Sequence, residues 1–594
     1  MRYLISFLFF FVFQNVVAQN DLLAKQYFED GNFEKAAFYY EKLYEQNPNR
    51  EDYLKYLITA FQQLEKYDTV SSMLLPKIEN PFISPIFIVE LGYNYMLQGN
   101  ITEAQKYYQQ AITKIEKNPS YAFLVGDSFK KKALLNEALR AYEKALQVKS
   151  SPNIRIEIAK IYGEQGNIEK MFDSYLSLIN QNNAYLPNVL RGINQFISED
   201  PNNENNLHFK KILLKKAQSN PNILWNELLS WLFVQQKQYN SAFIQEKAIL
   251  KRSETTTIER IMDLGILSME NADEETAEAI FEYVIRNANN RALQLQAHLF
   301  IVDFALKNSD QKNYAAIEAD FQKLIKEFGI SPETINLQKE YANFLAFYKN
   351  TPSEGERTLK ETLNLPLNRF EEAEVKMALA DILVYDEKFN QALIYYSQIQ
   401  KSLKNDVIAQ KARFKVAKTS FYKGDFDWAL TQLKVLRSST TQLIANDAMQ
   451  LSLLISDNSL EDSTQTALKI YAKADLLAYQ NKEPEAITLL DKILNDHRGE
   501  RIEDEALLKQ GALLEKQKKY DKARLNYIKI IEFYSDDILS DDALYALAEL
   551  YSVHFNNPEE AKKYYERIVF EHPDSIYFVE SRKKFRKIRG DAIN

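Results

Sequence analysis

The chain has 594 residues, of which 74 are basic and 82 are acidic, and its formal net charge is −8. This acidic balance argues against a general nucleic-acid binder, which needs a basic surface to match phosphates. The sequence has no cysteine, which excludes disulfides, thiolate chemistry and zinc sites built on cysteine. With 35 Phe and 36 Tyr the chain can bury ample apolar surface, so we expect a folded protein.

Residues 1–18 predict a secretory signal peptide. Arg2 supplies a positive charge, residues 4–13 are almost wholly apolar, and cleavage is expected after Ala18. The alternative is a membrane anchor, but this run is shorter than the roughly 20 apolar residues that span a bilayer. We therefore expect an exported chain with no transmembrane segment in its mature form. The lack of cysteine favours a bacterial envelope over a eukaryotic secretory route.

A spacing of about 34 residues recurs in the N-terminal part of the chain. Ala104, Ala138 and Met171 are separated by 34 and 33 residues, and Ala36 precedes Ala104 by two such periods. A tyrosine follows each of these positions four residues later. A period of this length is typical of stacked helical hairpins.

At these positions the chain resembles the tetratricopeptide repeat (TPR) family. In this family the first helix of each repeat (helix A) carries a small residue, and the second helix (helix B) carries a small residue followed by an aromatic. The matching positions are Gly92, Ala104 and Tyr108; Gly126, Ala138 and Tyr142; Ala380, Ala392 and Tyr396; Ala417 and Ala429; Gly511, Ala523 and Tyr527; and Ala548, Ala561 and Tyr565. The resemblance implies an all-α fold, a right-handed superhelical solenoid of antiparallel helix pairs.

Polar stretches rich in turn-forming residues divide the mature chain into four expected segments. Residues 19–195 form an N-terminal TPR array, 205–330 a divergent TPR-like helical segment, and 331–458 a middle TPR-like segment. Residues 464–594 form a C-terminal TPR array that ends in a basic capping helix. The alternative is that the polar stretches are long loops in one continuous array.

The resemblance also predicts where a partner binds, because helix A lines the concave surface in TPR proteins. The predicted partner groove consists of Tyr93, Met96, Lys130, Asp381, Tyr385, Lys418, Phe421, Tyr422, Tyr545 and Glu549. Aromatic side chains mixed with both signs of charge suit an extended peptide or an amphipathic helix. The alternative is that these residues pack against a neighbouring helix.

The last helix is rich in basic residues, namely Arg582, Lys583, Lys584, Arg586, Lys587 and Arg589. One interpretation is a solubilising cap, since the last repeat of a solenoid has no neighbour. The other is a basic tail that contacts an acidic partner or an anionic lipid.

No residue pattern indicates a catalytic, cofactor or metal site. The five histidines lack the spacing of a zinc-binding pair, and there is no glycine-rich phosphate loop and no calcium loop. We therefore expect a protein that is not an enzyme and has no cofactor.

The last 130 or so residues resemble the TPR units of envelope assembly proteins of the BamD and CpoB type. This resemblance implies protein partners in the envelope or the outer membrane. The leading hypothesis is an exported scaffold or adaptor for a bacterial cell-envelope complex, periplasmic or peripherally associated with the outer membrane. The alternatives are a periplasmic chaperone that holds exported clients, and a ligand-binding or enzymatic role in the divergent middle segment.

Overall fold

The computed structural model describes residues 20–253, 257–308, 313–436, 442–459 and 465–591. Every regular element in these ranges is a helix, which confirms the expected all-α fold. Within the same ranges no helix combines the length and the apolar character that crossing a membrane requires. The predicted signal peptide lies outside the described residues.

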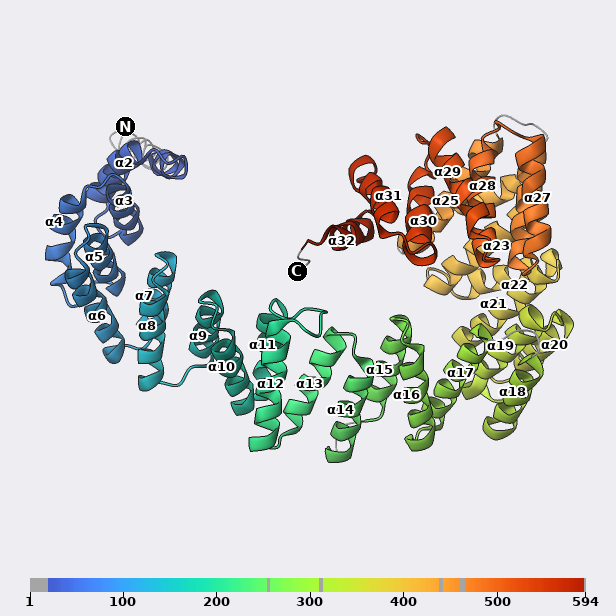
Figure 1. Cartoon of the computed structure of the whole chain (residues 1–594), viewed down its shortest axis with the longest axis horizontal. Helices are drawn as coiled ribbons and strands as arrows, with labels where there is room; N and C mark the ends of the chain where they lie inside the picture. Colours follow the sequence, from blue (N-terminus) through green and yellow to red (C-terminus); the bar gives the residue numbers. More distant parts are fainter. Residues whose placement is uncertain (1–19, 254–256, 309–312, 437–441, 460–464, 592–594) are drawn as a thin grey trace, which may run out of the picture. The chain divides into compact units, whose positions relative to one another are not determined.

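The chain divides into two compact units, residues up to 253 and residues from 254 onward. This boundary falls inside the segment 205–330 that the sequence marks as divergent. Each unit is a solenoid of stacked antiparallel helix pairs, as Figure 1 shows.

The first unit begins with a helix over residues 20–29 that pairs with α2, and the later helices pair in chain order. Within this unit the odd-numbered helices from α3 to α13 are helices A, and the even-numbered helices from α4 to α14 are helices B. The bounds are α2 (Phe33–Gln46), α3 (Glu51–Gln63), α4 (Tyr67–Ile78), α5 (Pro85–Leu97), α6 (Ile101–Lys117), α7 (Tyr121–Lys131), α8 (Leu135–Val148), α9 (Pro152–Glu164), α10 (Ile168–Gln181), η1 (Asn183–Tyr185), α11 (Leu186–Asn194), α12 (Glu204–Ser219), α13 (Ile223–Gln235) and α14 (Tyr239–Arg252).

The second unit continues the A–B alternation. Its bounds are α15 (Glu259–Glu270), α16 (Glu274–Asn287), α17 (Arg291–Lys307), α18 (Tyr314–Phe328), η3 (Pro332–Thr334), α19 (Ile335–Asn343), η4 (Phe344–Tyr348), α20 (Pro352–Thr362), α21 (Arg369–Tyr385), α22 (Phe389–Ser402), α23 (Val407–Lys423), α24 (Phe426–Leu436), α25 (Gln442–Ser459), α26 (Thr466–Tyr479), α27 (Glu483–Asp496), α28 (Ile502–Lys516), α29 (Tyr520–Phe533), α30 (Ser540–Glu549), η5 (Leu550–His554), α31 (Pro558–Glu571) and α32 (Phe578–Arg589).

Helix α25 interrupts the alternation, because it is an extra helix between the B helix α24 and the A helix α26. Its apolar residues Ile444, Ala448, Leu451 and Ile455 join the core formed by α23, α24 and α26 to α28. Helix α23 packs directly against α26, so the stack of A helices continues past the insertion.

Small residues allow helices A and B to approach closely. A Cβ atom added to Gly92 would lie 2.6 Å from the ring of Tyr108, and one added to Gly126 would lie 2.4 Å from the ring of Tyr142. Both rings are buried, so neither can move out into solvent. The small-residue positions of the sequence pattern are therefore explained by direct ring-to-backbone packing.

Most turns between helix A and helix B contain one residue in the left-handed backbone conformation. At Gly31, Gly99, Gly166 and Gly424 the residue is glycine, which adopts this conformation without a steric cost. The same conformation occurs at residues that carry a side chain, namely Glu65, Ala133, Lys237, Ala272, Asn350, Glu387, Asn481, Lys518 and Asn556. The turn geometry is thus a property of the repeat and does not depend on glycine.

Candidate functional site

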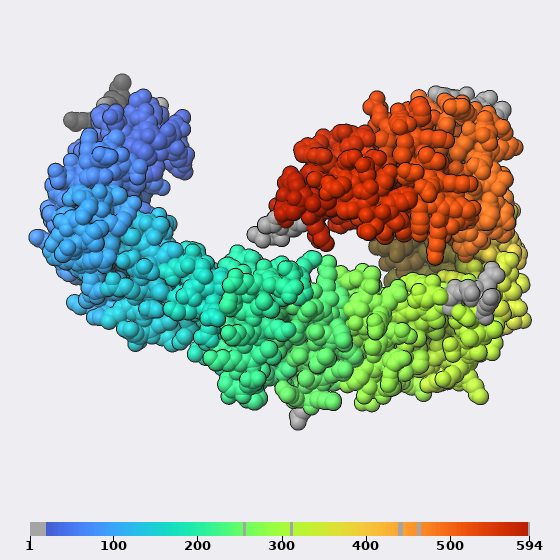
Figure 2. Space-filling view, viewed as in Figure 1, coloured from blue at the N-terminus to red at the C-terminus, as the bar shows by residue number. Residues whose placement is uncertain are grey.

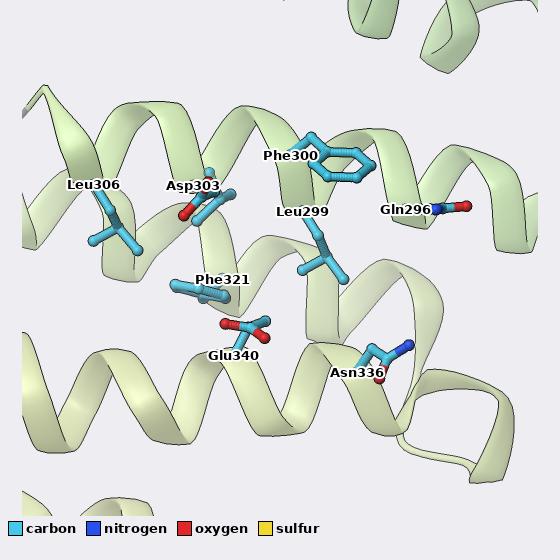
Figure 3. Close-up of a pocket in the computed structure, with 9 residues that line it drawn as sticks. Gln296, Leu299, Phe300, Asp303, Leu306, Phe321, Asn336 and Glu340 are labelled. Atoms are coloured by element: carbon cyan, nitrogen blue, oxygen red, sulfur yellow. The ribbon is translucent and has the colours of Figure 1, made fainter. Parts of the chain in front are cut away.

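A pocket of about 270 Å³ lies between three successive helices of the second unit, α17, α18 and α19 (Figure 3). Helices α17 and α19 are neighbouring A helices, and α18 is the B helix between them in the chain. The pocket is lined by Gln296, Leu299, Phe300, Val302, Asp303 and Leu306 of α17, Phe321 of α18, and Asn336 and Glu340 of α19.

The floor of the pocket is apolar. Leu299, Phe300 and Leu306 lie three, four and ten residues after Gln296, which places these four residues on one face of α17. Phe300 stacks on Phe281 with 4.7 Å between ring centroids, and Phe321 is completely buried. These contacts fix the positions of the Phe300 and Phe321 rings.

The rim of the pocket is polar and carries negative charge. Asp303 and Glu340 lie on facing helices with Phe321 between them, as Figure 3 shows. Partial desolvation raises the pKa of Glu340 above its ordinary value, and the nearby charge of Asp303 raises it further. Lys307 offsets some of this charge, because its Nζ lies 2.7 Å from Asp303 Oδ2. A cationic group entering the pocket would be attracted to both carboxylates.

The size of the pocket limits what it can hold. Sites for drug-sized ligands and cofactors span roughly 300–1,000 Å³. At about 270 Å³ this pocket lies just below that range and suits one or two side chains of a peptide.

The groove residues predicted in the first unit lie on helices A, and each has a partner within the chain. The Tyr108 hydroxyl lies 3.6 Å from the sulfur of Met96, and the ammonium of Lys132 lies 4.4 Å from the centroid of the Tyr93 ring. Lys130 Nζ is 2.7 Å from Glu157 Oε2, which belongs to the next A helix, α9.

In the second unit, two of the predicted groove residues belong to a ladder of ion pairs between A helices. Asp381 of α21 accepts hydrogen bonds from Lys415 Nζ at 2.7 and 2.8 Å. Asp475 of α26 lies between Lys418 Nζ of α23 at 2.6 Å and Lys509 Nζ of α28 at 2.5 Å. We call these five residues the ion-pair ladder. It joins four A helices, so Asp381 and Lys418 stabilise the stack itself.

Three aromatic residues of the predicted groove lie in or near the core. Phe421 is completely buried, so its expected position in a groove is wrong. Tyr385 is also buried. Its hydroxyl donates a hydrogen bond to Asn350 Oδ1, and its ring packs edge-on against Phe347. Tyr422 is half-buried.

Helix α32 covers the two groove residues that were predicted on α30. The ring of Tyr577, directly before α32, stacks on Tyr545 with 4.2 Å between centroids. Lys584 Nζ lies 2.5 Å from Glu549 Oε1, and Glu549 also accepts a hydrogen bond from Tyr565. The prediction that Tyr545 and Glu549 face an open groove is therefore wrong, because the chain's own last helix packs there. Lys584 likewise faces the protein, whereas the other five basic residues of this helix are exposed.

Sequence reasoning did not identify the pocket on α17 and α19. The sequence pattern that indicates the pocket is the apolar face of α17. The residues opposite this face on α19, Asn336 and Glu340, are polar. An A helix with an apolar face needs an apolar neighbour, and α19 does not supply one at these two positions.

Four of the histidines contact acidic or aromatic side chains of the chain itself. His208 lies near Glu169 and Glu204, His497 contacts Glu500, His298 packs on Phe328 and His554 stacks on Tyr520. Over the described part of the chain, no group of three or more His, Asp or Glu residues could hold a metal ion.

Glu505 of α28 makes the stability of the folded chain depend on pH. Burial and the hydrogen-bonded neighbour Asp504 raise the pKa of Glu505 well above its ordinary value of 4.5. The folded chain therefore keeps a proton that the unfolded chain releases above about pH 4.5, and stability falls as pH rises. We expect Glu505→Gln, which is neutral in both states, to lessen the loss of stability between pH 5 and pH 8. Urea denaturation at both pH values tests this, and an unchanged difference would contradict it. The exposed control is Glu532→Gln on α29.

Comparisons with known proteins identify the repeats at both ends of the chain. The sequence profile of the tetratricopeptide repeat matches residues 22–50, 505–537 and 542–575, and a second profile of this repeat matches 87–113. These ranges coincide with observed helix pairs such as α5–α6 and α28–α29. The chain thus contains tetratricopeptide repeats, as the sequence pattern predicts.

A TPR repeat-containing protein of Methanocaldococcus jannaschii is 30% identical over 191 residues, which make up 30% of this chain and 33% of that protein. The match thus spans about a third of the length of this curated relative.

Three solved structures cover most of the chain at low identity. Naa15/Naa10 bound to HypK-THB is 12% identical, covers 97% of each chain and has a TM-score of 0.30. The Cut9–Hcn1 hetero-tetramer of APC/C is 13% identical, with 97% of each chain covered and a TM-score of 0.21. Yeast Tom70 is 14% identical, with 84% of this chain and 99% of that chain covered and a TM-score of 0.30.

Proposed function

We propose that this chain is an exported, non-catalytic scaffold that holds a protein partner in a bacterial cell-envelope complex, in the periplasm or at the periphery of the outer membrane. The observation that carries the proposal is the pocket between α17 and α19. It lies between neighbouring A helices, and it offers an apolar floor with a charged rim. Tetratricopeptide repeats typically serve as surfaces for protein partners, which agrees with this role.

The location in the envelope rests on the sequence. Residues 1–18 have the pattern of a signal peptide, and the exported chain has no cysteine. The resemblance of the last repeats to envelope assembly proteins of the BamD and CpoB type supports the same compartment.

The pocket suggests the chemistry of the partner. An apolar side chain such as Leu, Met or Phe would fill the floor, and a neighbouring Lys or Arg would reach Asp303 and Glu340. A side chain anchored in an apolar pocket at the centre of an interface is often a hot spot, whose removal costs 2 kcal/mol or more in binding, about a 30-fold loss of affinity.

The test is affinity purification of the full-length tagged chain from gently solubilised envelopes of the source bacterium, followed by mass spectrometry. Leu299→Glu places a charged side chain on the apolar floor, and an apolar anchor that packs there would have to remove this carboxylate from water. We expect a few partners in fixed ratios, and about a tenfold lower recovery with Leu299→Glu. The matched control is Leu525→Glu on the B helix α29, where the wild-type side chain is 54% exposed. Circular dichroism checks that both variants are folded.

Two outcomes would contradict the proposal. Equal recovery with Leu299→Glu and with the control would show that the pocket does not hold the partner. A broad mixture of unrelated clients in variable ratios would favour a chaperone over a scaffold.

A further inference from the structure

The outward face of α32 combines basic and apolar residues. Its inward face is fixed to the protein, because Ser581 and Phe585 are buried and Lys584 pairs with Glu549. Its outward face carries the exposed basic residues Arg582, Lys583, Arg586 and Lys587, with Arg589 at its edge. In the space-filling view the dark red residues of α31 and α32 form the surface at the end of the second unit (Figure 2).

Helical spacing places these residues on one stripe. Val579, Arg582, Lys583, Arg586 and Lys587 follow the spacing i, i+3, i+4, i+7 and i+8, which marks a single helix face. Val579 is 68% exposed and lies at the N-terminal end of the stripe.

Two further exposed apolar side chains lie on the segments that directly precede α32. Phe570, near the end of α31, is 71% exposed, and its ring centroid is 6.5 Å from that of Phe585 on α32. Ile576, in the turn before α32, is 73% exposed. Three large apolar side chains with this much exposure within residues 570–579 indicate a surface that contacts something apolar.

The charge of the segment opposes that of the whole chain. Residues 578–591 contain six basic residues and two acidic ones, a net charge of +4, whereas the chain as a whole carries −8. Both acids are engaged on the segment itself, since Glu580 lies 3.9 Å from Lys584, and Asp591 pairs with Arg586 and Arg589. Lys584 faces inward and pairs with Glu549, but the other five basic residues are exposed, so the outward face attracts anions although the protein is acidic.

We propose that the outward face of α32, together with Phe570, Ile576 and Val579, binds an anionic phospholipid surface. Basic side chains of an amphipathic helix are attracted to anionic headgroups, and adjacent apolar side chains enter the boundary between headgroups and acyl chains. An acidic protein would neutralise the charges but would leave three large apolar side chains without a counterpart. This inference does not depend on the pocket or on the scaffold role.

The test is sedimentation of the purified full-length chain with vesicles. We expect binding to vesicles of equal parts phosphatidylglycerol and phosphatidylcholine, and none to vesicles of phosphatidylcholine alone. Salt at about 0.5 M should weaken the binding strongly, because the Debye length falls to a few ångströms.

Paired variants separate this surface from general electrostatics. Arg582→Gln with Lys587→Gln removes two charges from the stripe and is expected to weaken vesicle binding about 30-fold. The matched control, Lys401→Gln with Lys404→Gln, removes two exposed charges near the end of α22 and should change nothing. Ile576→Ser with Val579→Ser should weaken binding at both low and high salt, because it removes the apolar contribution.

Several results would overturn the proposal. These are no sedimentation with anionic vesicles, equal binding to neutral ones, or equal weakening by both glutamine pairs. Binding to soluble poly-glutamate without binding to vesicles would assign the surface to an acidic protein instead.

Discussion

Gly126→Val is expected to lower the free energy of unfolding of the first unit by about 3 kcal/mol. The new Cβ would lie 2.4 Å from the ring of Tyr142, which is completely buried between α7 and α8. The Tyr142 hydroxyl also donates a hydrogen bond to Asp127 at 2.9 Å, so moving the ring breaks this bond as well. Urea denaturation, combined with hydrogen exchange of α7 and α8, measures the effect.

A control and a rescue variant test the cause of this loss. Lys131→Val introduces the same residue at an exposed position of α7 and should cost less than 1 kcal/mol. Replacing Tyr142 with leucine makes room for the valine, so the double variant should lose less stability than the two single losses combined. If the two losses of stability simply add in the double variant, the Tyr142 ring and the new valine do not compete for the same space.

Asp475→Asn is expected to destabilise the second unit by about 2 kcal/mol at neutral pH. Burial alone would raise the pKa of Asp475, but the charges of Lys418 and Lys509 outweigh it and lower the pKa from 3.8 to about 2. A shift of this size corresponds to about 2 kcal/mol. The variant leaves two half-buried ammonium groups without their shared carboxylate. Both remain close to water, which keeps the loss below the 3–5 kcal/mol of a deeply buried pair.

The same carboxylate predicts an acid dependence that the variant lacks. Because the folded pKa is lowered, the stabilisation is complete above about pH 4 and disappears as pH falls through about 2. The wild-type chain should therefore lose about 2 kcal/mol more than Asp475→Asn between these pH values. Asp521→Asn, in an exposed pair with Arg524, serves as the control. Parallel pH profiles of the wild type and Asp475→Asn would contradict the prediction.

The fold could be predicted because the packing of each repeat requires particular residue types at fixed positions, above all small residues in contact with aromatic rings. Gly92, Gly126, Tyr108 and Tyr142 show those requirements in the sequence, since each ring needs a residue without a side chain beneath it. Ala133 could be recognised as a turn position from its spacing alone, although its left-handed conformation favours glycine.

The pocket on α17 and α19 was not predicted, and the predicted groove was placed only in part, because the repeat fixes which helix a residue occupies but not what covers it. Asp381 and Lys418 lie on A helices as expected. The partner of Lys418 is Asp475, 57 residues later and beyond the inserted helix α25, which no repeat spacing indicates. Tyr545 is likewise covered by a terminal segment whose docking depends on tertiary contacts.

The left-handed turn residues have a consequence for the evolution and engineering of this chain. A residue with a Cβ in this conformation carries a steric penalty of roughly 1–2 kcal/mol, which glycine avoids at some cost in chain entropy. Glu65, Ala133, Lys237, Ala272, Glu387 and Lys518 each carry this penalty in a separate turn. Because neighbouring repeats interact mainly with each other, the local stability of each hairpin can be adjusted almost independently. Substituting glycine for one of these residues thus changes mainly the stability of its own hairpin, together with any ion pair of the replaced side chain, such as that of Glu387 with Lys473.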